Sequence, residues 1–135
     1  MKIYAKPMPR LVLIVDDSET CAETLQVALE SIHDIEPRVV RNLAAALDAC
    51  RETTNEIAAL LTDLHIASGN GFDLIAQLRA EPRFARVPVL LISGDSDPLL
   101  PARARAAGVD AFIPKPYSPS AVRRKLEELI CSGNH

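Results

Sequence analysis

The stretch that decides the fold is LVLIVDDS, residues 11–18, in which five consecutive apolar residues end on two adjacent aspartates. An unbroken apolar run of this length is typical of a strand that is covered on both faces, as in a parallel sheet. Shorter or similar runs recur at residues 38–40, 57–61, 87–92 and 111–113. We therefore predict five strands, of which the one at 38–40 is the weakest.

Between these runs, apolar residues recur at the helical period of about 3.6 residues. Such stripes lie within residues 21–32, 43–50, 74–78 and 122–130. The segment 98–107 is rich in Leu and Ala, and its prolines, Pro98 and Pro101, fit only the first turn of a helix. Strands that alternate with helices predict an α/β fold: a doubly wound (βα)5 three-layer sandwich around a parallel five-stranded sheet.

Length and composition fit one globular domain. We expect it to span residues 11–131, between an N-terminal leader at 1–10 and a C-terminal tail at 132–135. A net charge of −3 and the lack of Trp argue against direct nucleic-acid binding, and no apolar stretch is long enough for membrane insertion or for a signal peptide. Cys21, Cys50 and Cys131 lack zinc or disulfide spacing, so we expect reduced thiols that fill the core, and a cytoplasmic location.

Polar residues follow four of the predicted strands. Asp16 and Asp17 follow the first, Asp63 the third, Ser93 the fourth and Lys115 the fifth. In open α/β sheets, ligands bind outside the carboxyl ends of the strands. If the strand order is 2-1-3-4-5, as in flavodoxin-like folds, the three aspartates share one crevice. Their repulsion predicts a divalent cation, for which Mg²⁺ fits, beside a phosphoryl group.

Four segments together resemble the response regulator receiver domains of two-component signal transduction: LVLIVDDS (11–18), LLTDLHIASGNGFDLI (60–75), VPVLLISGD (87–95) and AFIPKPY (111–117). The resemblance extends over about residues 11–130 and rests on the joint spacing of the acid pair, the acceptor Asp, the Ser and the Lys-Pro. It implies the flavodoxin-like order 2-1-3-4-5 and a stand-alone receiver similar to those of chemotaxis.

The resemblance implies that Asp63 accepts a phosphoryl group from a phosphohistidine on a sensor histidine kinase or a histidine phosphotransfer protein. It implies that Mg²⁺, or Mn²⁺, is bound by Asp63, by Asp17 directly, by Asp16 mainly through water, and by the backbone carbonyl of His65. Lys115 and Ser93 would hold the phosphoryl oxygens.

The same resemblance implies a switch formed by Ser93 and Phe112, which would alter the face made by the fourth helix, the fifth strand and the fifth helix for a downstream protein. His65 and Asp95 would tune the lifetime of the aspartyl phosphate. It also implies that the Lys115–Pro116 bond is cis. The chain departs from the family pattern at Ala67, which stands where Pro is usual and should loosen the loop slightly.

Other interpretations remain at this stage. Taken alone, Asp17 or Ser18 could simply cap a helix that begins near Glu19, and Asn70-Gly71 is best interpreted as the turn that starts the third helix. A haloacid-dehalogenase-like phosphohydrolase would carry its nucleophile in a DxD motif after the first strand, where this chain has DDS. A receiver-like scaffold that is never phosphorylated would not need the acid pair, the acceptor and the lysine. We therefore expect a signalling phosphoacceptor that catalyses only its own phosphorylation and dephosphorylation.

Overall fold

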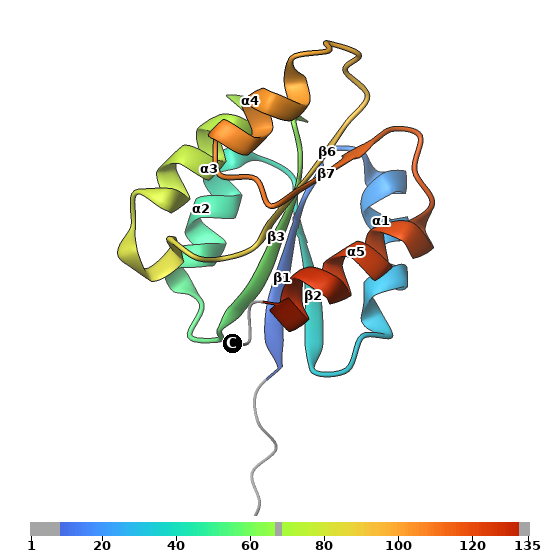
Figure 1. Cartoon of the computed structure of the whole chain (residues 1–135). Coiled ribbons are helices and arrows are strands. Elements are labelled where there is room, and N and C mark those ends of the chain that lie inside the picture. Colours follow the sequence, from blue (N-terminus) through green and yellow to red (C-terminus); the bar gives the residue numbers. More distant parts are fainter. Residues whose placement is uncertain (1–8, 67–68, 133–135) are drawn as a thin grey trace, which may run out of the picture.

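A parallel five-stranded sheet forms the centre of the molecule (Figure 1). The computed structural model describes residues 9–66 and 69–132. The strands of the central sheet are β1 (Arg10–Val15), β2 (Ile35–Val40), β3 (Ile57–Asp63), β6 (Val89–Ser93) and β7 (Ala111–Pro114). They lie in the order β2-β1-β3-β6-β7, which is 2-1-3-4-5 when only these strands are counted along the chain. The predicted flavodoxin-like order is confirmed.

Helices cover both faces of this sheet, with α1 and α5 on one side and α2, α3 and α4 on the other (Figure 1). Their bounds are α1 (Glu19–Glu30), α2 (Leu43–Glu52), α3 (Gly71–Arg79), α4 (Leu100–Ala106) and α5 (Pro119–Ser132), and a short 3₁₀ helix, η1 (Pro82–Phe84), follows α3. Since each βα unit returns to a parallel neighbour, the result is the predicted three-layer sandwich.

Strand β1 shows why the apolar runs are continuous. Val12 and Ile14 belong to the apolar cluster on the side of α1 and α5, whereas Leu13 and Val15 belong to the cluster on the side of α2, α3 and α4. All four side chains are fully buried. Fully burying one such side chain contributes about 1.5–3 kcal/mol. The strand therefore stabilises both layers at once.

Side-chain caps fix where three helices begin. Ser18 accepts a hydrogen bond from the backbone N–H of Cys21 (3.4 Å), and α1 begins at Glu19 as expected. Asn42 caps α2, and the Asn70 side chain accepts from the N–H of Asp73 (3.1 Å) to start α3. Such caps contribute about 1 kcal/mol each. The prediction that Asn70-Gly71 starts the third helix is confirmed.

Several element bounds differ from the sequence prediction. The second strand runs over residues 35–40, because an edge strand tolerates Pro37. The fourth strand of the central sheet begins only at Val89, because Pro88 has no N–H to donate to a ladder. A small hairpin, β4 (His65–Ile66) with β5 (Gly69–Asn70), was not predicted. Ala67, the departure from the family pattern, lies outside the described residues.

The three cysteines do not behave alike. Cys50 is buried, and burial raises the pKa of its thiol to about 11. Cys21 is only partly buried and Cys131 is exposed, so the prediction that all three fill the core is wrong for Cys131. The reason is its position beyond Ile130, the last buried residue of α5.

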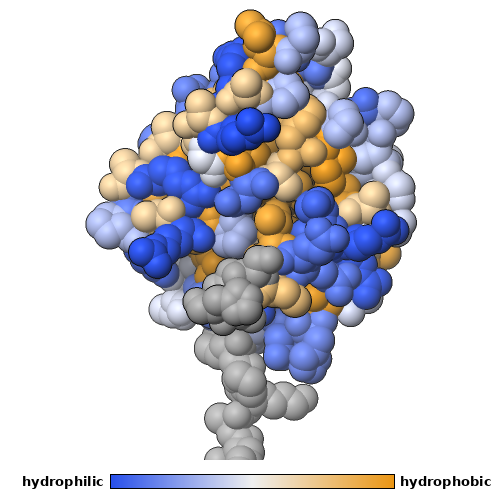
Figure 2. Space-filling view, viewed as in Figure 1, coloured by the Kyte–Doolittle hydropathy of each residue, from blue (hydrophilic) through white to orange (hydrophobic). Residues whose placement is uncertain are grey.

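Hydrophilic side chains are interspersed with hydrophobic ones over the face shown in Figure 2. Among the described residues, Val27 and Leu99 are the large hydrophobic residues that are most exposed. Within residues 9–66 and 69–132, none of the helices has the length and apolar character that crossing a membrane requires.

Candidate functional site

The strand ends bring the predicted polar residues to one edge of the sheet. Asp16 follows β1, Asp63 ends β3, Ser93 ends β6, and Lys115 follows β7. The backbone N–H of Lys115 donates to the Ser93 carbonyl (2.8 Å), which aligns the ends of the last two strands. Asp16, Asp63 and Ser93 are all buried. The structure therefore gathers buried polar groups where this fold binds ligands.

Asp63 is held by contacts to both carboxylate oxygens. The Lys115 ammonium lies 2.5 Å from Oδ2, and the backbone N–H of His65 donates to Oδ1 (3.1 Å). Burial alone would lower the pKa of Lys115, but the hydrogen bond to Asp63 and the charges of Asp63 and Asp16 outweigh it and raise that pKa. Lys115 is therefore a cation, fixed beside the carboxylate.

Asp16 is a buried acid whose ionisation is disfavoured by its surroundings. Burial is the largest influence and raises its pKa, the charges of Asp63 and Asp17 raise it further, and the hydrogen bond from the Ser18 N–H (2.8 Å) together with Lys115 opposes this. Because the folded-state pKa lies above the unfolded value, stability falls as the pH rises through the interval between them. At neutral pH, ionised Asp16 thus costs folding free energy.

The donor set fits a divalent cation that brings further oxygen ligands with it. The two buried carboxylates, Asp16 and Asp63, face a single ammonium, Lys115, so one negative charge is left over. Across the described ranges, no three His, Cys, Asp or Glu side chains group closely enough to hold a metal unaided, and Asp17 is exposed. Mg²⁺ prefers one or two carboxylates with waters and phosphoryl oxygens, which matches such a partial set.

A pair of side chains links β4 to the loop that follows β6. Asp95 Oδ2 lies 3.5 Å from His65 Nε2, and the Asp95 N–H donates to the Oγ of buried Ser93 (3.0 Å). The N–H of Asp97 and then His65 lower the pKa of Asp95. Ser93 is thereby connected to His65 and Asp95, the pair that the resemblance predicts to tune the lifetime of the aspartyl phosphate.

Residues 12–127 match the family model of the response regulator receiver domain. The chain belongs to this family. The receiver domain is 28% identical over 123 residues to a CheY homolog, a chemotaxis protein of Campylobacter jejuni, with 90% of this chain and 93% of the relative covered. It is 30% identical over 127 residues to chemotaxis protein CheY1 of Helicobacter pylori, covering 87% and 94%.

Among solved structures, the signal receiver domain of a signal transduction histidine kinase from Syntrophus aciditrophicus is similar, with a TM-score of 0.82, 28% identity and 93% of each chain covered. The protein is therefore a receiver domain of two-component signalling, and the phosphohydrolase and scaffold interpretations are not favoured. Receiver domains generally bind a divalent metal ion and interact with histidine kinases and downstream targets.

Phe112 lies within β7 of the receiver domain, and Lys115 directly follows this strand. Phe112 is partly buried and packs against the apolar cluster on the side of α2, α3 and α4. The Lys115–Pro116 bond is cis, as predicted. An apolar groove opens beside Lys115, and its walls come from the start of α1 and the residues after β7: Thr20, Cys21, Thr24, Pro116, Tyr117 and Pro119.

Two features of the receiver site were not predicted from the sequence. A Cβ on Gly71 would lie 2.8 Å from the carbonyl oxygen of Asp63, so α3 can start this close to the acceptor only with glycine. The sequence predicted a turn at Gly71, but not that a side chain there would clash with the Asp63 carbonyl. The sequence paired His65 with Asp95 in lifetime control but did not predict that their side chains contact each other.

Proposed function

We propose that Asp63 accepts a phosphoryl group from the phosphohistidine of a sensor histidine kinase or a histidine phosphotransfer protein. The observation that carries this proposal is the Asp63–Lys115 pair: a buried carboxylate at a strand end, with an ammonium 2.5 Å from one oxygen. A surface acid would not need a fixed cation. Such a cation compensates the negative charge that phosphorylation adds.

In the transfer step, a carboxylate oxygen of Asp63 attacks phosphorus. The phosphorus–nitrogen bond of the donor breaks, and its electron pair returns to the imidazole. The product is an acyl phosphate on Asp63. Lys115 then holds a phosphoryl oxygen, and the buried Ser93 hydroxyl donates to another. The apolar groove beside Lys115 would receive the surface of the donor protein.

Asp16, Asp17, Asp63 and the backbone carbonyl of His65 would hold Mg²⁺, or Mn²⁺ in its place. When bound, the ion compensates the charge that develops on the transferring phosphoryl group. The leftover negative charge of the buried acids and the raised pKa of Asp16 support this assignment. The free cysteines fit a reducing, cytoplasmic location.

Loss of the phosphoryl group requires a water molecule to attack the phosphorus of the acyl phosphate. His65 begins β4 just after the acceptor, Asp95 lies in the loop after Ser93, and their side chains contact each other at 3.5 Å. Their side chains would restrict the approach of that water. We assign them the control of the aspartyl-phosphate lifetime.

The output surface consists of α4, β7 and α5. Ser93 would move toward the new phosphoryl oxygens, and Phe112, which is only partly buried, would move into the space that Ser93 leaves. Helix α4 has seven residues, of which only Leu100 and Ala104 are buried, so it is the helix most easily displaced. Leu99, exposed just before α4, gives this face an apolar contact for a downstream protein.

Labelling with acetyl phosphate and Mg²⁺ tests the acceptor. The wild type should gain one acid-labile phosphoryl group, and Asp63→Asn or chelation of the metal should abolish the gain. Asp97→Asn is the matched control, because it removes a partly exposed carboxylate near the same edge. Full labelling of Asp63→Asn would overturn the assignment.

Chemical-shift mapping with beryllofluoride tests the output. Changes should concentrate in the loops around Asp63 and on α4, β7 and α5. Changes confined to α1 and α2 would contradict the switch.

A further inference from the structure

A second cavity, of about 570 Å³, lies at the opposite edge of the sheet from Asp63. The starts of β1 and β3, the segment that joins η1 to β6, and Ile130 of α5 line it. Small-molecule sites commonly have volumes of about 300–1,000 Å³. The cavity is therefore large enough for a small ligand, and the phosphorylation chemistry does not use it.

The lining of this cavity is positively charged. Arg10, Arg83 and Arg86 contribute three positive charges, and Glu56 contributes one negative charge. The whole chain, by contrast, has a net charge of −3. The C-terminal end of α5 adds only about half a negative charge. An excess of positive charge therefore remains where the rest of the protein is acidic.

Two of these arginines are available to a ligand. Arg83 is positioned in advance, because its Nη2 donates to the Thr53 carbonyl (2.6 Å) and its guanidinium lies 5.0 Å from the centre of the Phe84 ring. This leaves most of its five N–H donors for other partners. The exposed Arg86 side chain forms no hydrogen bond or ion pair with the part of the chain that the structure describes.

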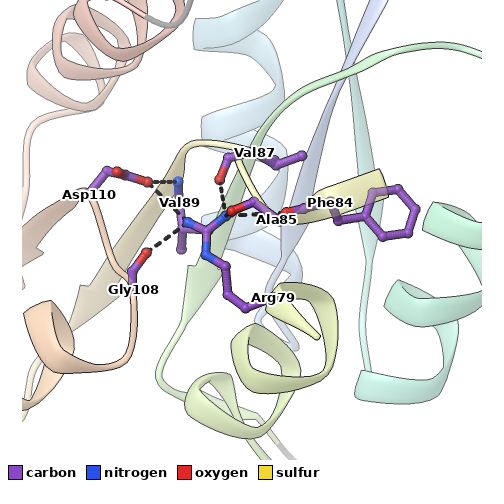
Figure 3. Close-up of polar contacts among 7 residues, drawn as sticks. All are labelled: Arg79, Phe84, Ala85, Val87, Val89, Gly108 and Asp110. Atoms are coloured by element: carbon purple, nitrogen blue, oxygen red, sulfur yellow. Dashed lines mark hydrogen bonds and ion pairs between the residues drawn. The ribbon is translucent and has the colours of Figure 1, made fainter. Parts of the chain in front are cut away.

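One wall of the cavity is held in place from behind (Figure 3). Arg79 Nη1 donates to the carbonyls of Phe84 (3.2 Å), Ala85 (3.0 Å) and Val87 (2.7 Å), and its Nη2 donates to Gly108 (2.7 Å). Since residues 84–87 belong to the lining, these bonds fix the shape of the cavity. A site that is formed in advance loses less ordering entropy when a ligand binds.

We propose that this cavity binds a compact polyanion that carries phosphate or carboxylate groups. Guanidinium groups match the geometry of both, and they can bind either through two parallel hydrogen bonds. Thr54 and Asn55 add polar groups to the lining. Among the described residues of the lining, Phe84 is the one aromatic residue, and it is 3% exposed, so it offers no face on which a nucleobase could stack. The ligand is therefore recognised through its charges.

Amide chemical-shift titrations with pyrophosphate and, separately, with citrate test this proposal in the absence of Mg²⁺. Saturable changes should centre on Asn55, Glu56 and Arg86. The Arg83→Gln/Arg86→Gln double variant should bind about tenfold more weakly or worse, since it loses two charge-assisted contacts. Tighter binding of pyrophosphate assigns phosphate as the recognised group, and tighter binding of citrate assigns carboxylate.

Two controls separate this site from other effects. The matched Arg105→Gln/Arg124→Gln variant removes two exposed arginines elsewhere and should keep the affinity. Asp63→Asn should also keep it, so the outcome does not depend on the phosphoacceptor assignment. Changes centred on Lys115, equal weakening in both double variants, or no saturable binding of either anion would overturn the proposal.

Discussion

Replacing Arg79 with Ala should destabilise the fold far more than replacing other arginines does. The guanidinium of Arg79 donates to three carbonyls of residues 84–87 and to the Gly108 carbonyl, and it pairs with Asp110 at 3.2 Å. Asp110 in turn accepts from the N–H of Val89 (2.8 Å). One side chain thus joins the end of α3 to the segments that precede β6 and β7 (Figure 3).

The size of the loss follows from how accessible these groups are. An acceptor that stays buried without a partner costs about 1–3 kcal/mol. The Arg79 side chain is 22% exposed, so water would reach some of the freed carbonyls. The pair with Asp110, whose side chain is 45% exposed, contributes less than about 1 kcal/mol. We therefore expect a loss of about 3 kcal/mol in the free energy of unfolding.

Thermal and urea denaturation measure this loss. An unfolding entropy of about 2.1 cal/mol/K per residue gives about 0.28 kcal/mol/K for this chain, so Tm should fall by about 10 °C. Arg79→Lys should lie between the wild type and Arg79→Ala, because it keeps the charge but has fewer donors. Arg124→Ala, at an exposed position, should change stability by less than about 0.5 kcal/mol. If Arg79→Ala lost less than about 1 kcal/mol, or no more than Arg124→Ala, the reasoning would be refuted.

Three further predictions concern the acidic edge. Asp16→Asn should stabilise the metal-free protein at neutral pH, because ionised Asp16 costs folding free energy. This gain in stability should disappear as the pH falls to the unfolded pKa of Asp, or when excess Mg²⁺ stabilises the wild type. Denaturation at several pH values with and without Mg²⁺ checks this, and a destabilised metal-free variant would contradict it. Gly71→Ala should lower the free energy of unfolding by about 1–3 kcal/mol, because the new methyl group would lie 2.8 Å from a carbonyl oxygen. Gly94→Ala should be tolerated, because the nearest neighbour of its methyl group lies 3.6 Å away. Equal denaturation midpoints for the two variants would count against the steric argument. The His65→Ala/Asp95→Ala double variant should lose its phosphoryl group several-fold faster in a dephosphorylation time course, and a rate equal to that of the wild type would exclude the pair from lifetime control.

The strands and the site edge could be predicted from the sequence because they follow from periodicity and topology. Continuous apolar runs mark strands that are buried on both faces, and parallel strands end at one edge, so Asp16, Asp63, Ser93 and Lys115 had to meet once the order was 2-1-3-4-5. The exact bounds were less accessible. The bounds of β2 and β6 depend on individual hydrogen bonds of the sheet at Pro37 and Pro88, and the periodicity of apolar residues does not describe such bonds.

Contacts between residues that lie far apart in the sequence could not be predicted in this way. The Arg79 side chain reaches the carbonyl of Gly108, 29 residues away, and Gly71 must be small because of the Asp63 carbonyl at the end of β3. These contacts depend on the length and rotamer of a side chain and on the path of a loop. They leave no periodic trace in the sequence. The same is true of the arginine-lined cavity, whose residues come from four separate segments.

The central claim is that phosphorylation occurs on Asp63 and nowhere else, and locating the phosphoryl group tests it most directly. After incubation with acetyl phosphate and Mg²⁺, borohydride reduction converts a phosphorylated aspartate to homoserine, which peptide mass spectrometry can place in the sequence. The account predicts homoserine at position 63 alone in the wild type and none in Asp63→Asn. Homoserine at position 16 or 17 of the wild type, or conversion that persists in Asp63→Asn, would contradict it.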